Sequence, residues 1–175
     1  MTDATPHATR RMAIEAVIAA ILLAMAFSAI AASDVSAMGS NSYWLGLVVV
    51  FALVSYGFDR MGSTGSWIDL TALSRTAVHW IGVLAAVQLV HVFVQAGQMT
   101  NADTGLACGL ILALGAFTAG AWGNWRMGVL GIALAVATAV VAMVDQYLWV
   151  LLAIAAVTIA VMLLVARLRR GRPGA

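Results

Sequence analysis

Long apolar runs separated by short polar segments form the pattern of this chain. Each run contains almost only apolar side chains and ends at glycine, serine, asparagine or charged residues. The runs cover approximately residues 12–32, 42–58, 76–97, 104–122, 127–144 and 146–166. A helix needs about 20 apolar residues, within a range of about 17–25, to cross a hydrocarbon core of about 30 Å. The pattern therefore predicts six transmembrane helices, because the runs are too long for barrel strands.

The composition agrees with lipid as the main solvent. Of the 175 residues, 63% are hydrophobic and only 9% are charged, whereas a soluble domain usually has about 25% charged residues. We therefore predict an all-α integral membrane protein. Its single six-helix transmembrane domain covers residues 12–166, between an N-terminal tail (1–11) and a basic C-terminal tail (167–175).

The arginines predict the orientation of these spans. The chain has nine arginines and no lysine, and with six spans all nine fall on one side of the membrane. The three connections on the other side carry Asp34, Asp103 and Asp145. Cytoplasmic loops are enriched in positive charge, so both termini are predicted to be cytoplasmic. The basic charge is explained by topology, without nucleic acid as a partner. The alanine-rich, lysine-free composition favours a bacterial inner membrane.

The first run has a second interpretation. Residues 9–33 begin with two arginines, continue with apolar residues and end near an Ala-x-Ala sequence at Ala29–Ala31. A secretory signal peptide has the same order of features, but its apolar region is usually shorter. We therefore expect the run to be retained as the first span. Cleavage would leave five spans with the same partition of arginines.

The third run carries the polar residues that are candidates for a functional site. At about 100° per residue, Gln88, His91, Gln95 and Gln98 fall within about 80° of one helix face. An unpaired amide in lipid costs several kcal/mol, so this face is expected to point away from the hydrocarbon. It can form hydrogen bonds between helices. Alternatively, it can line an outward-opening pathway for a small solute, an ion or protons, since histidine can exchange a proton near neutral pH.

Three further polar residues are expected near the cytoplasmic surface. His79 lies away from this face, about one turn from Arg75, and both are predicted to be interfacial. Glu15 is the acidic residue within the first span, one turn from Arg11. We expect a local ion pair between Glu15 and Arg11. A role for Glu15 as a proton-coupling carboxylate is the alternative.

Small residues recur at helical spacing and predict close helix packing. Ala20, Ala24 and Ser28 follow one another every four residues in the first span, and Gly105 and Gly109 do so in the fourth. Small side chains let helix backbones approach closely in a membrane. The spacing does not distinguish contacts within the chain from contacts with another copy.

Aromatic residues stand near the ends of the runs. Trp44 lies near the predicted outer boundary, and Trp80, Trp122 and Trp125 lie near the inner one. Tryptophan is enriched at both surfaces of a bilayer. We therefore interpret these residues as interfacial belts.

Motifs for catalysis and cofactors are sparse. The single cysteine, Cys108, excludes a disulfide within the chain. His79 and His91 are 12 residues, or about 18 Å, apart on one helix, so they cannot ligate one haem from opposite faces. A haem would need His91 together with a ligand from another chain. The sequence has no His-Glu-x-x-His motif and no Walker A loop, so no metal is predicted and an enzyme is not favoured.

These observations lead to one expected function and two alternatives. We expect a passive channel or small secondary transporter for a small solute, ion or protons, lined by Gln88, His91 and Gln95. The alternatives are a non-catalytic membrane subunit or scaffold, and a haem-binding membrane subunit. The expected partners are the lipid bilayer and either further copies of the chain or another membrane protein.

Overall fold

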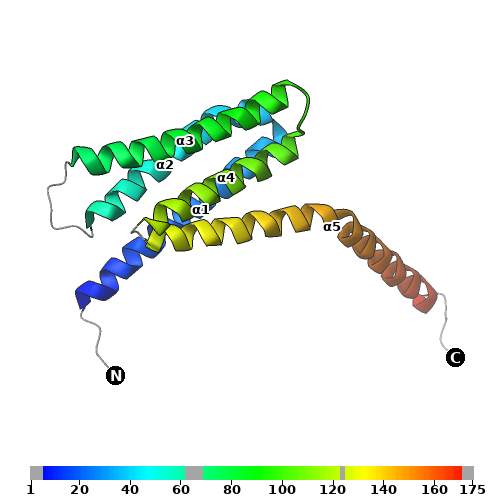
Figure 1. Cartoon of the computed structure of the whole chain (residues 1–175). Coiled ribbons are helices and arrows are strands. Elements are labelled where there is room, and N and C mark those ends of the chain that lie inside the picture. Colours follow the sequence, from blue (N-terminus) through cyan, green and yellow to red (C-terminus); the bar gives the residue numbers. More distant parts are fainter. Residues whose placement is uncertain (1–5, 62–68, 123–124, 171–175) are drawn as a thin grey trace. The chain divides into compact units, whose positions relative to one another are not determined.

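Five α-helices make up the structure, a computed structural model that describes residues 6–61, 69–122 and 125–170. They are α1 (Pro6–Val35), α2 (Ala37–Met61), α3 (Leu70–Gln95), α4 (Asn101–Ala121) and α5 (Trp125–Arg170) (Figure 1). No strand occurs among the described residues. Five segments are long and apolar enough to cross a membrane: Ala13–Val35, Ala37–Met61, Leu70–Gln95, Asn101–Ala121 and Trp125–Val144. The predicted all-helical class is confirmed.

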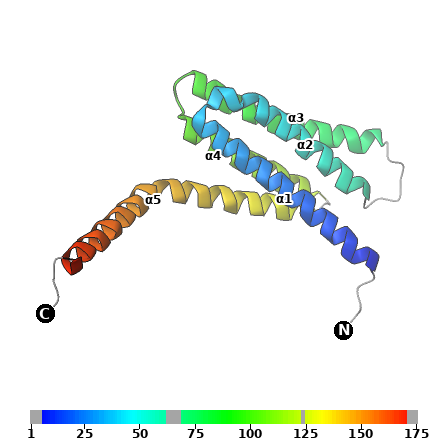
Figure 2. The same ribbon diagram turned by 180° about the vertical axis from the view of Figure 1, so that it is seen from behind.

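The chain divides into two compact units. The first ends at Thr138 and contains α1 to α4 with the first part of α5. The second begins at Ala139, and its described residues are the remainder of α5. Within the first unit, α1 packs against α2 and α4, and α3 packs against α2 and α4 (Figures 1 and 2). Consecutive helices run in opposite directions, because their connections are too short for crossovers.

The core of the first unit is made of large apolar side chains. The largest that are fully buried include Leu22, Trp44, Leu47, Phe51, Leu112 and Leu134. Trp44 and Trp80 are 0% and 3% exposed, so their prediction as interfacial belt residues is wrong. Trp122 and Trp125, by contrast, are exposed. Many outward positions are also apolar, among them Leu53, Val78, Leu114 and Val129. A protein that is apolar on its outside as well as inside is suited to lipid.

A single residue, Ser36, connects α1 to α2. Its hydroxyl accepts a hydrogen bond from the Gly39 N–H at 3.0 Å, which is how a serine caps the start of a helix. The sequence predicted a longer polar connection over residues 33–41, and that prediction is wrong. These polar residues are helical because their side chains find hydrogen-bond partners within the folded chain.

Two buried serines and a tryptophan form this hydrogen-bonded turn. Ser33 and Ser40, which are 0% and 3% exposed, share a hydrogen bond of 2.8 Å between their hydroxyl oxygens. The Trp44 indole N–H donates to the Ser33 hydroxyl at 2.8 Å. The Asn101 side chain from α4 accepts from the first N–H of α2 at 3.3 Å and donates to the last carbonyl of α1 at 3.5 Å. The cluster therefore fixes the entry of α2 into the core.

Ser33→Ala is expected to lower the free energy of unfolding by about 1–3 kcal/mol, because it leaves the buried Trp44 N–H without its acceptor. The measurement is unfolding in mixed detergent micelles. Ser28→Ala is the matched control, since Ser28 is exposed and its hydroxyl donates to the Ala24 carbonyl of its own helix. Equal stability of the two variants would contradict the role of the cluster.

Helix caps extend α3 and α4 beyond the predicted spans. The Asp69 carboxylate accepts from two backbone N–H groups of the first turn of α3 and lies 3.6 Å from the Arg60 guanidinium. α3 therefore begins at Leu70 instead of residue 76, and Arg75 lies within it. Thr100 and Asp103 form a reciprocal capping box at the start of α4. Each cap supplies partners for N–H groups that a helix start leaves unpaired.

The last helix differs from the prediction of two spans, 127–144 and 146–166. The backbone is helical at Asp145 and Gln146, where a turn was expected. Residues 143–150 contain neither glycine nor proline, so nothing in this stretch breaks helical hydrogen bonding. α5 has 46 residues, about twice the number that one membrane span requires.

Candidate functional site

The polar face predicted on the third span is divided in the structure. Gln88 is half-buried and donates from its amide to the Asn41 side-chain oxygen of α2 at 2.9 Å. His91 is buried, at 1% exposed. Gln95, the last residue of α3, and Gln98, in the connection that follows, are both exposed. Within the described residues this face makes one interhelical hydrogen bond, at Gln88, and none of its four residues lines the pocket described below.

The ring of His91 has a defined tautomer. Its Nδ1 lies 2.9 Å from the Val87 carbonyl oxygen, and a carbonyl can only accept, so Nδ1 carries the proton. In neutral histidine the other nitrogen, Nε2, then has a lone pair. Nε2 is buried and has no hydrogen-bond partner among the described residues. A buried acceptor without a donor costs free energy, which makes this atom a candidate for a functional contact.

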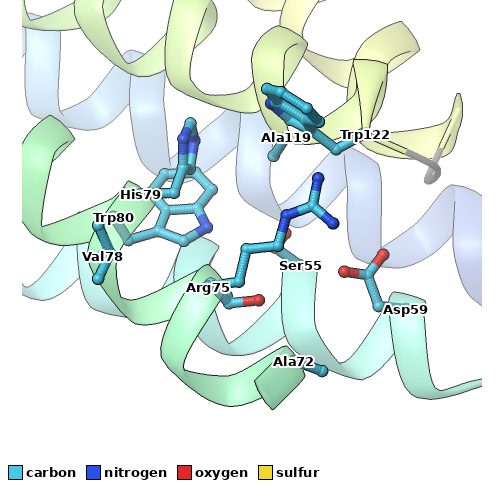
Figure 3. Close-up of a pocket in the computed structure, with 10 residues that line it drawn as sticks. Ser55, Asp59, Ala72, Arg75, Val78, His79, Trp80, Ala119 and Trp122 are labelled. Carbon is cyan, nitrogen blue, oxygen red and sulfur yellow. The ribbon is translucent and has the colours of Figure 1, made fainter.

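A pocket of about 310 Å³ lies at the opposite end of α3 (Figure 3). It is lined by residues of α2, α3 and α4 and by the residue that follows α4: Ser55, Asp59, Ala72, Arg75, Thr76, Val78, His79, Trp80, Ala119 and Trp122. These positions are in the last turns of α2, the first turns of α3 and the end of α4. Two residues predicted to be interfacial, Arg75 and His79, are thus brought together in one pocket.

Arg75 is held at the rim of the pocket by an aromatic ring. Its guanidinium carbon lies 4.7 Å from the centre of the Trp122 ring, within the range of a cation–π interaction. Figure 3 shows the side chain extending from α3 toward Trp122. Among the described residues this contact is the interaction that Arg75 makes. Its N–H donors therefore remain available at the pocket.

The floor of the pocket is buried and carries a second donor. Ser55 and Trp80 are each 3% exposed. The Trp80 ring packs against Phe51 at 6.0 Å between ring centres. The Trp80 Nε1–H has no hydrogen-bond partner among the described residues. In Figure 3 this nitrogen lies on the side of the ring that faces Arg75.

His79 connects the pocket wall to α4. Its Nε2 lies 2.9 Å from the Gly115 carbonyl oxygen, so Nε2 carries the proton, and in the neutral ring Nδ1 is an acceptor. The ring stands edge-on to Trp80, with ring centres 5.4 Å apart. Gly115 allows α3 to pack closely on α4, since a Cβ at this position would lie 2.7 Å from the Val83 side chain. The close packing of α3 on α4 therefore fixes His79.

Asp59 gives the rim a negative charge next to the positive one. Asp59 and Arg75 are both exposed and line the same pocket from different helices. Their opposite charges, the donors on the floor and the Trp122 ring suit a small polar ligand with both charged and apolar atoms. In the part of the chain that the structure describes, no three His, Cys, Asp or Glu residues come together to hold a metal ion.

Glu15 has a partner that the sequence did not indicate. Its carboxylate accepts from Arg126 Nε of α5 at 2.7 Å, and the two side chains are 16% and 26% exposed. The side chain of Arg11, the expected partner, lies outside the described part. The Glu15–Arg126 pair joins the start of α1 to the start of α5.

The small residues separate into an inner and an outer set. Gly105 and Gly109 are buried, and a Cβ at either position would come within 2.9–3.1 Å of Ile30 in α1. Gly109 also faces Thr138 of α5. These glycines pack helices within the chain. Ala20, Ala24 and Ser28, in contrast, are exposed on α1.

Sequence reasoning missed Ser55, Asp59, Trp80 and Trp122 as members of one pocket. A signal for part of it is present, because Ser55 and Asp59 are four residues apart, as are Arg75 and His79. Residues four apart share one face of a helix. Two such polar faces on consecutive antiparallel helices, each near the same end, indicate a polar site between them.

No family model matches the chain, and no curated protein or solved structure has significant similarity to it. The class of the protein therefore has to be argued from its helices and its pocket. Within the described residues it is an all-helical protein with five helices of membrane-spanning length and apolarity.

Proposed function

We propose that the chain is a multi-pass protein of the bacterial inner membrane with six spans and both ends in the cytoplasm. One support is the length of α5, because its 46 residues are about twice the number that one crossing of a core of about 30 Å requires. In this proposal the chain reverses direction near Asp145 and Gln146, which differs from the continuous helix of α5 at these residues, and residues 146–166 form the sixth span. A further support is that Arg60, Arg75 and Arg126 all lie at helix ends on one side of the first unit.

A C-terminal fusion tests the span count. With six spans and a cytoplasmic N-terminus, green fluorescent protein at the C-terminus is expected to fluoresce, and alkaline phosphatase there is expected to be inactive. Fusions after Thr100, in the α3–α4 connection, should behave in the opposite way and provide the control. An active phosphatase at the C-terminus would instead mean an odd number of spans.

We propose, as function, that the protein is a small secondary transporter or passive channel that binds a small solute in the pocket of Arg75 and Trp80. The observation that carries this proposal is a pocket of about 310 Å³ with an unpaired donor on its buried floor. Ligand sites are concave, largely apolar and equipped with a few polar groups. Pockets of about 300–1,000 Å³ are typical, so this one suits a small molecule.

The third helix supplies further polar groups beyond the pocket. Gln88 and His91 lie 13 and 16 residues after Arg75, or about 20 and 24 Å farther along the helix axis. Polar groups at membrane depth often mark solute or proton pathways. In this proposal the solute enters from the arginine-bearing end and passes along α3, with Nε2 of His91 as a contact on the route.

Uptake into proteoliposomes tests the proposal. We expect at least one of four radiolabelled probes (glycine, phosphate, choline or glycerol) to enter faster than it enters protein-free liposomes. Thr76→Trp, which fills the pocket, and His91→Leu are expected to abolish the difference. Ser74→Trp is the matched control, since Ser74 is exposed and outside the pocket lining. Uptake of no probe, or uptake unchanged by Thr76→Trp, would exclude the pocket as a transport site.

A role as a membrane subunit or scaffold is the second candidate. The exposed Ala20, Ala24 and Ser28 of α1 favour it, because small residues every four positions allow another helix to approach closely. Ala24→Phe is expected to disrupt self-association or partner binding without unfolding the chain. Gly105→Phe would not serve as this test, since Gly105 packs against Ile30 inside the chain.

Haem binding at His91 is the third candidate. The proton on Nδ1 and the unpaired Nε2 resemble a metal-ligating histidine, which donates its other ring N–H to a carbonyl. The second axial ligand would come from another copy or a partner. A Soret band in purified, haem-replete protein is the expected sign, and its absence from folded protein would exclude this candidate.

A further inference from the structure

Arg75 presents a fixed set of donors at the pocket rim. Its guanidinium is positioned by the Trp122 ring at 4.7 Å, and no described residue uses its N–H groups. A planar guanidinium binds two oxygens of a carboxylate or a phosphate at once. Since the side chain is held in place before a ligand arrives, little further ordering is required on binding. The rim therefore suits the anionic end of a ligand.

The floor of the pocket also suits an acceptor oxygen of a ligand. The indole N–H of Trp80 can only donate, and in this 3% exposed residue it has no acceptor among the described residues. A buried donor that stays unpaired costs free energy. An oxygen of a ligand that reaches from Arg75 into the pocket would supply the acceptor (Figure 3).

Asp59 determines which anions are suitable. Its carboxylate lines the same pocket as Arg75. A like charge close to Asp59 is unfavourable, whereas an opposite charge is favourable. A ligand that is only an anion gains from Arg75 but is repelled by Asp59. A ligand that also carries an ammonium group gains at both positions.

We propose that this pocket binds a small zwitterion, with its carboxylate or phosphate oxygens at Arg75 and Trp80 and its ammonium group at Asp59. The inference rests on the proposed function, whose solute site is the same pocket. Two sources present this chemistry. One is a free solute of the amino-acid type, and the other is the headgroup of phosphatidylethanolamine in the surrounding bilayer.

Binding to the full chain, purified in detergent without phosphatidylethanolamine, provides the first measurement. By titration calorimetry we expect glycine or O-phosphoethanolamine to bind more tightly than inorganic phosphate or choline. This comparison uses the wild-type protein, so it does not depend on whether a variant folds. Tighter binding of phosphate or choline than of both zwitterions would overturn the proposal.

Variants that remove one charge test the proposal by the direction in which the binding affinity changes. Arg75→Gln is expected to weaken zwitterion binding about tenfold or more. Asp59→Asn is expected to weaken it about threefold or more, whereas for a simple anion the same change would tighten binding. Asp34→Asn, an exposed carboxylate outside the pocket lining, is expected to have no effect. Tighter or unchanged zwitterion binding by Asp59→Asn would also overturn the proposal.

Nanodiscs distinguish the two sources. If free zwitterions do not bind, phosphatidylethanolamine is expected to raise the thermal midpoint of unfolding relative to phosphatidylglycerol, and Arg75→Gln is expected to remove the difference. This result would assign the site to the lipid headgroup. An absence of both effects would overturn the proposal.

The uptake assay separates this inference from the proposed function. Pocket-dependent uptake of phosphate, choline or glycerol but not of glycine would retain the transporter and reject the zwitterion. Zwitterion binding that depends on Arg75, without uptake of any probe, would retain the binding site and reject transport.

Discussion

Gly120→Ala is expected to destabilise the first unit by about 3 kcal/mol or more. Gly120 is near the end of α4, and a Cβ placed on it would overlap the backbone nitrogen of Gly128 in α5. The obstacle is main chain, so no side-chain rotation can remove it, and the two helices would have to separate. Separation would also loosen Gly131, which lies directly against the backbone of Phe117.

Three other glycines provide matched controls. A Cβ on Gly46, Gly57 or Gly82 would meet nothing within 4 Å, although all three are within helices. Because alanine has a higher helix propensity than glycine, these substitutions are expected to be neutral or to stabilise by up to about 1 kcal/mol. Unfolding in mixed micelles measures all four variants. Gly120→Ala as stable as Gly82→Ala would contradict the close approach of α4 and α5.

The hydrophobic pattern predicted α1 to α4 because each of them contains one long apolar run, but it divided the residues of α5 into two spans. It could not predict where their polar ends lie. Ser33 and Ser40 resembled loop residues in the sequence, but their hydroxyls bond each other and the Trp44 indole in the folded chain. The boundary of α1 and α2 thus depends on contacts between helices, which composition does not contain.

Prediction of the pocket also requires the contacts between helices. The sequence singled out the row from Gln88 to Gln98 because four polar residues share one face of a single helix. The pocket combines six residues of α3 with two of α2, one of α4 and Trp122, so no single helix displays it. The pairing of α2 with α3 and of α3 with α4 has to be known first.

Arg126→Met is expected to lower the free energy of unfolding by about 2 kcal/mol. The substitution retains an unbranched side chain but removes the charged donor that lies 2.7 Å from the Glu15 carboxylate. Both side chains are mostly buried, at 26% and 16% exposed, so salt screens their attraction only weakly. The start of α1 would lose its ionic link to the start of α5.

A double-mutant cycle isolates the pair. With Glu15→Gln as the second change, the coupling free energy is expected to be about 1.5–3 kcal/mol. Arg60 and Asp69 supply a comparison, because their charged groups are farther apart, at 3.6 Å, and the Asp69 side chain is 44% exposed while that of Arg60 is 7% exposed. The longer distance and the solvent around Asp69 are expected to make their coupling weaker. A coupling for Glu15 and Arg126 no larger than that of Arg60 and Asp69 would contradict the structural importance of the bond.

The same variants decide between two roles for Glu15. If Glu15 stabilises the fold through Arg126, Glu15→Gln lowers stability, and uptake by the protein that remains folded keeps its dependence on a proton gradient. If Glu15 instead carries the coupled proton, Glu15→Gln abolishes that dependence while stability changes little. The bond to Arg126 favours the first outcome, because the Glu15 carboxylate accepts from Arg126 Nε at 2.7 Å and so joins α1 to α5.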